Sequence, residues 1–138
     1  MRVTLVASVM LISMLGCEQH VARSTVYIKL QQPQHAFQFS ETIPPEKDGT
    51  IAALLEFGKT SDSDCRELVS PLGAWTCEGP AETFLRFEED LGKNRMVATF
   101  ALVVRAPDDQ LIFQEYVDAF SAFMSSEFGP SNTVVETQ

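Results

Sequence analysis

Cysteine, histidine and paired acidic residues are the side chains of this chain that could do chemistry. The 138 residues include three Cys and two His. Adjacent carboxylates occur at Glu88-Glu89-Asp90 and at Asp108-Asp109. Two carboxylates can act as general acid and base when both face one site. Strand alternation sends neighbours in the first group to opposite faces, and the second group is expected at a helix start, so neither predicts a catalytic dyad.

Metal-binding and catalytic motifs are missing from the sequence as well. Asp62-Ser63-Asp64 begins like a calcium-binding loop, but the glycine and the closing glutamate are missing at the spacing that such a loop needs. His35 stands alone near a predicted strand start. The sequence lacks the motifs of common hydrolases, zinc proteases and nucleotide-binding proteins. We therefore expect no enzyme activity, no cofactor and no metal site, and no small-molecule substrate is evident.

The N-terminal stretch has the layout of a secretory signal. Arg2 supplies a positive charge, and only Thr and Ser interrupt the apolar run of residues 3–15. The run is too short to span a bilayer, which needs about 20 residues. It ends in Met14-Leu15-Gly16-Cys17, which resembles the lipobox of bacterial lipoproteins. The alternatives are an ordinary cleaved signal and a buried cysteine that stands at this position by chance.

The resemblance implies how the chain is processed and where it is held. Residues 1–16 would be the cleaved signal peptide, and Cys17 would be lipidated on its sulfur and acylated on its new amino group. Because each buried methylene contributes about 0.8 kcal/mol, two or three acyl chains hold a protein on a membrane permanently. Glu18 after the lipidated cysteine implies an outer-membrane lipoprotein facing the periplasm. Residues 17–24 would then be a short lipidated tether, and residues 25–138 a single periplasmic domain.

Cys65 and Cys77 are the two cysteines that remain. An even pair in an oxidising compartment most simply forms a disulfide. A redox or zinc pair is the alternative, but the sequence has no CxxC motif and neither His has ligand spacing to these cysteines. Trp75 lies in the loop that this disulfide would close. A rigidly held Trp is a candidate partner contact, whereas the more common role of such a Trp is to cover the disulfide and the core.

Hydrophobic periodicity predicts the elements that position these residues. Strands are predicted by alternation at Thr25–Leu30, Glu82–Glu89 and Arg95–Arg105, with a further short strand at Phe37 and Phe39 and an edge strand within Asn132–Thr137. Gly92 and Asn94 favour a hairpin loop between the second and third of these. Lys59–Pro80 is expected to be a loop.

Two helices are predicted as well. The first covers Thr50–Phe57, where a strand is the alternative, with Asp48 or Thr50 as its cap and Gly58 as its end. The second begins at Pro107-Asp108-Asp109 and ends at Gly129-Pro130, and its aromatic stripe is expected in the core. The order of elements predicts a small α+β domain, a mostly antiparallel sheet with two helices on one face. The ferredoxin-like split βαβ arrangement is the closest named topology.

The charge balance limits the partners. The chain has 10 Lys+Arg against 19 Asp+Glu and a formal net charge of −9. Loss of residues 1–16, which hold one Arg and no acid, lowers this charge to −10. Phosphate binding needs clustered Lys and Arg, so nucleic acid is excluded. We expect a non-enzymatic protein-binding or accessory module of the cell envelope, held by its lipid. A periplasmic inhibitor or immunity protein against a cationic wall hydrolase or toxin is the alternative.

Overall fold

A computed structural model describes residues 20–31 and 45–137 of the chain. The elements in chain order are β1 (Val21–Lys29), α2 (Lys47–Thr60), β2 (Asp64–Glu67), β3 (Trp75–Glu78), β4 (Phe84–Asp90), β5 (Arg95–Val103), α3 (Asp109–Phe128) and β6 (Thr133–Thr137), with short 3-10 helices at Pro80–Glu82 and Pro130–Asn132. Cys17, His35 and the strand predicted at Phe37 and Phe39 lie outside the described residues. In the described part, neither helix is long and apolar enough to cross a membrane.

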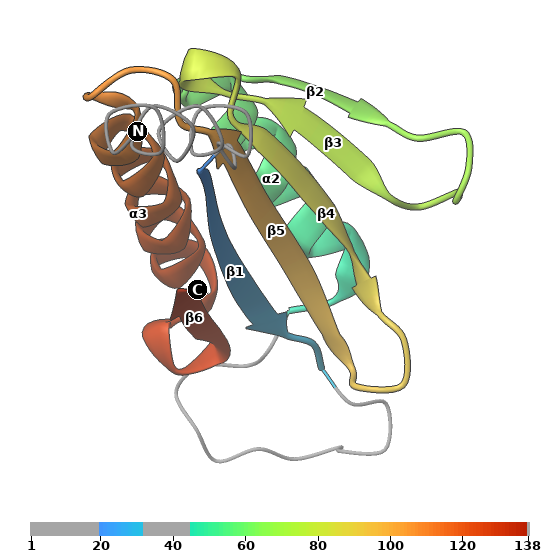
Figure 1. The fold of residues 1–138 in the computed structure, drawn as a ribbon. Coiled ribbons are helices and arrows are strands. Elements are labelled where there is room, and N and C mark those ends of the chain that lie inside the picture. Colours follow the sequence, from blue (N-terminus) through green and yellow to red (C-terminus); the bar gives the residue numbers. More distant parts are fainter. Residues whose placement is uncertain (1–19, 32–44, 138) are drawn as a thin grey trace, which may run out of the picture.

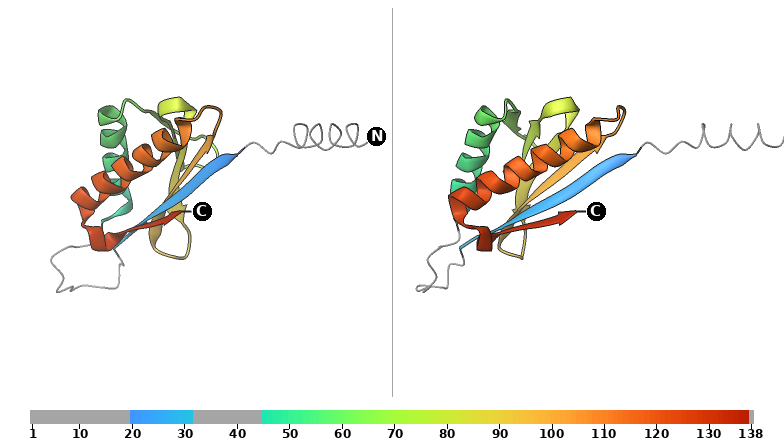
Figure 2. Two further views of the ribbon diagram at one scale, coloured as in Figure 1. Left: turned by 60° about the vertical axis from the view of Figure 1, so that its left-hand side comes forward. Right: turned by 90° about the vertical axis from the view of Figure 1, so that its left-hand side faces the viewer.

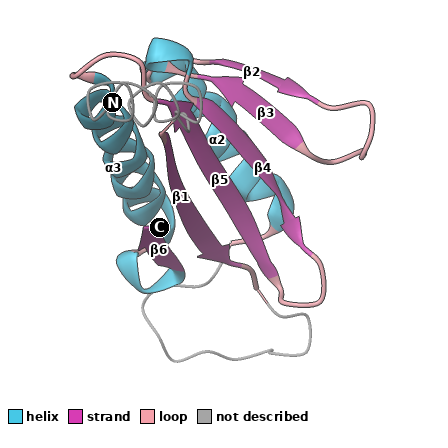
Figure 3. Cartoon of the chain, viewed as in Figure 1, coloured by secondary structure: helices cyan, strands magenta, loops and turns pink. Residues whose placement is uncertain are grey.

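The six strands form one antiparallel sheet with the order β2-β3-β4-β5-β1-β6 (Figure 1). Taken alone, β1, α2, β4, β5, α3 and β6 have the ferredoxin-like split βαβ arrangement, because β5 lies between β1 and β4 and β6 lies beyond β1. The β2–β3 hairpin is inserted after α2 and widens the sheet. Both helices cover the same face (Figures 2 and 3), so the predicted α+β architecture is confirmed.

Alternation along β1 shows how the sheet separates its two faces. Ala22, Ser24, Val26 and Ile28 are buried beneath the helices, and the residues between them point to the other side. The strand begins at Val21, paired with Val103, and not near Thr25 as predicted. The expected tether of residues 17–24 is therefore too long, since only residues 18–20 separate Cys17 from the sheet.

The core forms where both helices meet the sheet. The ring of Phe120 in α3 lies 5.2 Å from that of Phe57 in α2 and 5.2 Å from that of Phe100 in β5, between ring centroids. Val117 and Met124 of α3 are fully buried beside them. Burying each such side chain contributes about 1.5–3 kcal/mol. The aromatic stripe of α3 is therefore core, as its spacing predicted.

The segment between α2 and β4 differs from the prediction. Gly58 does not end the first helix, which continues to Thr60 and begins after Glu46 without a side-chain cap. The predicted loop of residues 59–80 contains the strands β2 and β3. The edge strand β2 is short and its exposed residues carry charge, so it lacks the apolar alternation that identifies a strand in a sequence.

Candidate functional site

Three apolar side chains stand almost fully in solvent on two neighbouring loops. Val69 is 93% exposed and Leu72 is 82% exposed in the loop between β2 and β3, and Leu91 is 82% exposed in the β4–β5 turn. Leu72 and Leu91 line one pocket of about 220 Å³. We call Val69, Leu72 and Leu91 the apolar loop surface. Side chains this exposed contribute nothing to the core, so their chemistry suits contact with another apolar surface.

The hairpin that carries Val69 and Leu72 is held in a fixed shape. Cys65 and Cys77, directly opposite each other on β2 and β3, form the disulfide that the sequence predicted. Beyond them, the Leu68 N–H donates to the Ala74 carbonyl at 2.8 Å, and the Ala74 N–H donates to the Pro71 carbonyl at 3.3 Å. A loop ordered before binding loses less conformational entropy when a partner docks on it.

An ion pair joins the two sides of the pocket. Lys47 at the start of α2 lies 3.4 Å from Glu89 of β4, between Nζ and Oε1. Gly73 has a positive φ of 92°, and a Cβ there would lie 3.4 Å from the Lys47 ammonium. Partly exposed ion pairs contribute about 0–1 kcal/mol, so this one adds little to the stability of the domain.

Trp75 is the first residue of β3 and follows the loop that carries Val69 and Leu72. It is half-buried on β3, lies directly opposite Phe87 of β4 and packs against the core. Its indole Nε1 is buried and has no hydrogen-bond partner within residues 20–31 and 45–137. This placement matches the role of a cover for the disulfide and the core. Direct contact of Trp75 with a partner stays a prediction.

The acidic groups singled out in the sequence serve the fold. The carboxylates of the first group pair with three different cations, as Glu88 with Arg86, Glu89 with Lys47 and Asp90 with Arg95. Two of these carboxylates point to the outer side of the sheet and Glu89 to the helix side, as alternation requires. None of them shares a site with another.

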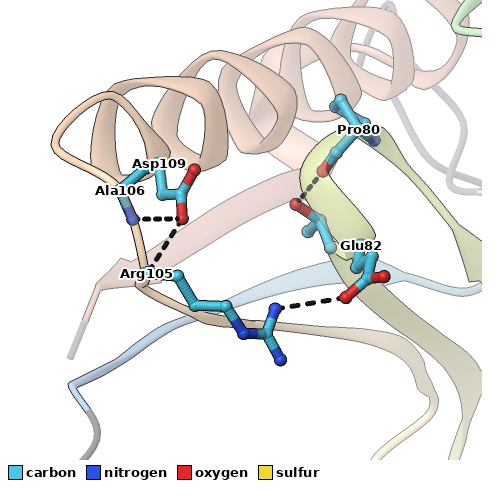
Figure 4. A network of polar contacts seen from close by, with 6 residues as sticks. Pro80, Glu82, Arg105, Ala106 and Asp109 are labelled. Atoms are coloured by element: carbon cyan, nitrogen blue, oxygen red, sulfur yellow. Dashed lines mark hydrogen bonds and ion pairs between the residues drawn. The ribbon is translucent and has the colours of Figure 1, made fainter.

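The Asp109 side chain binds the backbone that precedes α3 (Figure 4). Its carboxylate accepts the backbone N–H groups of Arg105 and Ala106 at 2.8 and 2.9 Å. These bonds to the charged form hold the pKa of Asp109 below its ordinary value. The Arg105 guanidinium also donates to Glu82 at 3.1 Å, which ties this end of the helix to the turn before β4. The pair Asp108-Asp109 is thus a helix start, as expected.

The acidic segment of residues 62–64, which follows α2, contacts α3. The Ser63 hydroxyl is hydrogen-bonded to the Tyr116 hydroxyl of α3 at 2.8 Å. Burial raises the pKa of Tyr116 above its ordinary value. In the described part of the chain, no group of three or more His, Cys, Asp or Glu side chains is arranged to hold a metal ion.

Sequence reasoning missed the apolar loop surface. Val69 and Leu72 stand among Ser, Pro and Gly in a segment without hydrophobic periodicity. This lack of periodicity is the one feature of the sequence that could have indicated that the two side chains lie outside the core. No protein family matches the chain, and a comparison with curated proteins finds no match. The functional proposal therefore depends on geometry and on the N-terminal motif.

Proposed function

We propose that the chain is a bacterial lipoprotein held at the outer membrane through Cys17, and that it acts without catalysis as a protein-binding module of the cell envelope. The apolar loop surface is its contact with the partner. The observation that carries this proposal is the exposure of Val69, Leu72 and Leu91, 82% or more each, on loops that meet at one pocket. A protein partner with a complementary apolar patch would cover them.

The position of these loops favours a protein over lipid as the occupant. The β4–β5 turn lies next to Lys29, at the end of β1 opposite Val21 (Figure 1). Since this strand has nine residues, its two ends lie about 26 Å apart at a rise of about 3.3 Å per residue. A lipid on Cys17 would hold the Val21 end near the membrane. The apolar loop surface would then face away from the bilayer, toward the periplasm.

Cross-linking in intact cells at native expression tests the proposal. The chain is extracted in detergent, and mass spectrometry identifies both the lipid on Cys17 and the proteins cross-linked to it. We expect one resident envelope protein in a stable ratio to the chain. The double substitution Leu72→Ser/Leu91→Ser should abolish its recovery while the amount of folded chain stays the same, because both side chains are already in solvent.

Leu111→Ser is the matched control. Leu111 is 61% exposed on α3, which begins at the Val21 end of the sheet. This variant should keep the partner. Equal recovery of the partner by all three proteins, or an unlipidated Cys17, would contradict the proposal.

An inhibitor of a cationic wall hydrolase or toxin is the second candidate. The observation that favours it is the charge of α3, which holds Asp109, Glu115, Asp118 and Glu127 and no Lys or Arg. Opposite fields speed association between such a helix and a basic enzyme. Purified chain added to a set of cationic wall hydrolases should then inhibit at least one of them. Full activity of every enzyme at micromolar chain would exclude this candidate.

A further inference from the structure

No helix in the described residues covers the outer face of the sheet, which consists of the alternate strand residues that point away from α2 and α3 (Figure 2). Phe84 on β4 is 47% exposed there, although it is a large aromatic side chain. Ala101 of β5, directly opposite Phe84, is partly exposed, and so is Val97, two rows farther along the same strand. A sheet with one polar face would place Thr, Lys or Glu at such central positions. This face therefore has an apolar centre without a cover.

Charged side chains on the outer face fall into two groups. Arg86 pairs with Glu88, and Arg95 pairs with Asp90. Six others are exposed and have no ion-pair partner in the described part of the chain, namely Arg23, Lys29, Asp64, Arg66, Glu78 and Glu136. Glu78 also lies directly opposite Asp64, and like charges in that position are unfavourable. The isolated chain thus leaves charges on this face uncompensated.

The strand register shows that four of these charges, Arg23, Arg66, Glu78 and Glu136, match one another across a two-fold axis. One row across the sheet runs Arg23–Ala101–Phe84–Glu78, on β1, β5, β4 and β3 in turn. A two-fold axis parallel to the strands, between β4 and β5, exchanges β1 with β3 and β5 with β4. In a second copy stacked face to face, Arg23 therefore meets Glu78, and Ala101 meets Phe84.

The next row repeats the match at the corners of the sheet. It runs from Glu136 on β6 to Arg66 on β2, through Thr25, Thr99, Arg86 and Thr76. The same axis exchanges β6 with β2, so Glu136 of one copy meets Arg66 of the other. Each of these four charges then has an opposite charge, and Arg23 also relieves the repulsion between Glu78 and Asp64.

From this self-complementarity, we infer that the outer face binds a second copy of the same chain, forming a two-fold dimer with two sheets packed face to face. Sheets that stack in this way keep their strands within about 30° and about 10 Å apart. The apolar centre of Phe84 and Ala101 is buried between the sheets. The inference does not rest on the proposed function, because it uses only the register, the charges and the exposure of this face.

The size of the face is sufficient for a stable dimer. The sheet has six strands, the longest of nine residues. With strands about 4.8 Å apart and up to about 30 Å long, the outer face covers roughly 600–700 Å² per copy. Two such faces bury about 1,200–1,400 Å², at the lower end of the range for stable interfaces. Two copies would repel each other through the acidic helix α3, which favours the outer face as the contact.

The axis direction also suits an anchored protein. Rotation about an axis parallel to the strands leaves both Val21 ends at the same end of the dimer. If Cys17 carries lipid, both anchors can enter one membrane, and both apolar loop surfaces point away from it. Two loop surfaces on one dimer would increase the avidity for a partner with two sites.

Charge reversal and its rescue test the inference. The full chain, solubilised in detergent, is studied by sedimentation equilibrium over micromolar concentrations, where we expect a dimer. Arg23→Glu and Glu78→Arg should each weaken dimerisation by about 10- to 100-fold, because symmetry places the altered contact in the interface twice. The double variant Arg23→Glu/Glu78→Arg should regain the wild-type dimerisation constant to within about tenfold.

Lys59→Glu is the matched control, since it makes a comparable change of charge on α2, away from the outer face. It should leave dimerisation unchanged. Phe84→Glu should give a monomer with native circular dichroism. A monomeric wild-type chain, or a double variant that stays as weak as the single ones, would overturn the inference. In the second case the dimer would not place Arg23 opposite Glu78.

Discussion

A Cβ atom placed on Gly58 would lie 2.9 Å from Sγ of Cys65. Gly58 is buried inside α2, and Cys65 is joined to Cys77 on the neighbouring strand. The missing side chain at position 58 thus allows the helix to pass directly over the disulfide. The hairpin that carries part of the apolar loop surface is fixed to the domain through this contact.

Gly58→Ala should destabilise the domain by about 1–2 kcal/mol, since two opposing effects leave a net loss. An exposed Gly→Ala change in a helix gains up to about 1 kcal/mol, but overpacking against a bonded sulfur that cannot rotate away costs about 1–3 kcal/mol. Gly49→Ala is the control in the same helix, because no atom lies within 4 Å of its added Cβ. It should stabilise by about 0.5–1 kcal/mol. Urea unfolding measures both, and a stabilised Gly58→Ala variant would contradict the contact.

Removal of the disulfide should lower the free energy of unfolding by about 3 kcal/mol. Its two cysteines have a sequence separation of 12. Closing a loop of that size lowers the conformational entropy of the unfolded chain, which raises the free energy of unfolding by about 3 kcal/mol. The variant Cys65→Ala/Cys77→Ala is compared with the wild type in urea, with and without reductant. Reductant should bring the wild type to the stability of the variant and leave the variant unchanged. A wild type that is insensitive to reductant would contradict this prediction.

Tyr116→Phe should cost about 0.5–1.5 kcal/mol near neutral pH. The reason is the loss of the hydrogen bond between Tyr116 and Ser63. The substitution should also change the alkaline limb of the stability curve. Burial raises the pKa of Tyr116 in the folded state above its ordinary value of 10.0. The unfolded chain therefore ionises first, and the contribution of Tyr116 is present below pH 10 and lost as the pH rises above it. Unfolding measured from pH 8 to 12 should show a shallower decline for the variant than for the wild type.

Asp109→Asn should weaken the start of α3 at neutral pH. The pKa of Asp109 is held below its ordinary value of 3.8 by two backbone N–H donors. Its contribution is therefore present above pH 4 and lost as the pH falls through the folded-state pKa. The wild type should be the more stable protein at pH 7, with the difference closing toward pH 2. Asp108→Asn removes the neighbouring charge without these two bonds, so a similar profile for both variants would contradict the prediction.

Trp75→Ala should destabilise the domain by about 2–3 kcal/mol. The reason is that the half-buried indole packs against the core. Leu72 in the adjoining loop is 82% exposed. Leu72→Ser should therefore change stability by less than about 0.5 kcal/mol. Trp75→Phe separates the two roles of the Trp. It should retain most of the stability, so loss of partner recovery in this folded variant would assign Trp75 a direct contact.

Local hydrophobic periodicity was sufficient to predict the strands and the helix whose apolar residues recur at regular spacing. The alternation in β1 and β5 and the aromatic stripe of α3 identified the central strands and the covering helix, because one buried face imposes a pattern on neighbouring residues. The parity of the cysteines identified the Cys65–Cys77 disulfide. The lipidation of Cys17 stays a prediction from its motif, since that residue lies outside the described part of the chain.

Features that depend on residues far apart in sequence came only from the fold. The strands β2 and β3 carry no periodic pattern and exist because β4 offers a free edge and the disulfide joins them. Leu72 and Leu91 meet because two loops end at the same side of the sheet. Arg23 and Glu78 share a row because three successive strand registers align them. Local sequence determines which face of a strand is buried, whereas pairing between distant strands determines which side chains lie together.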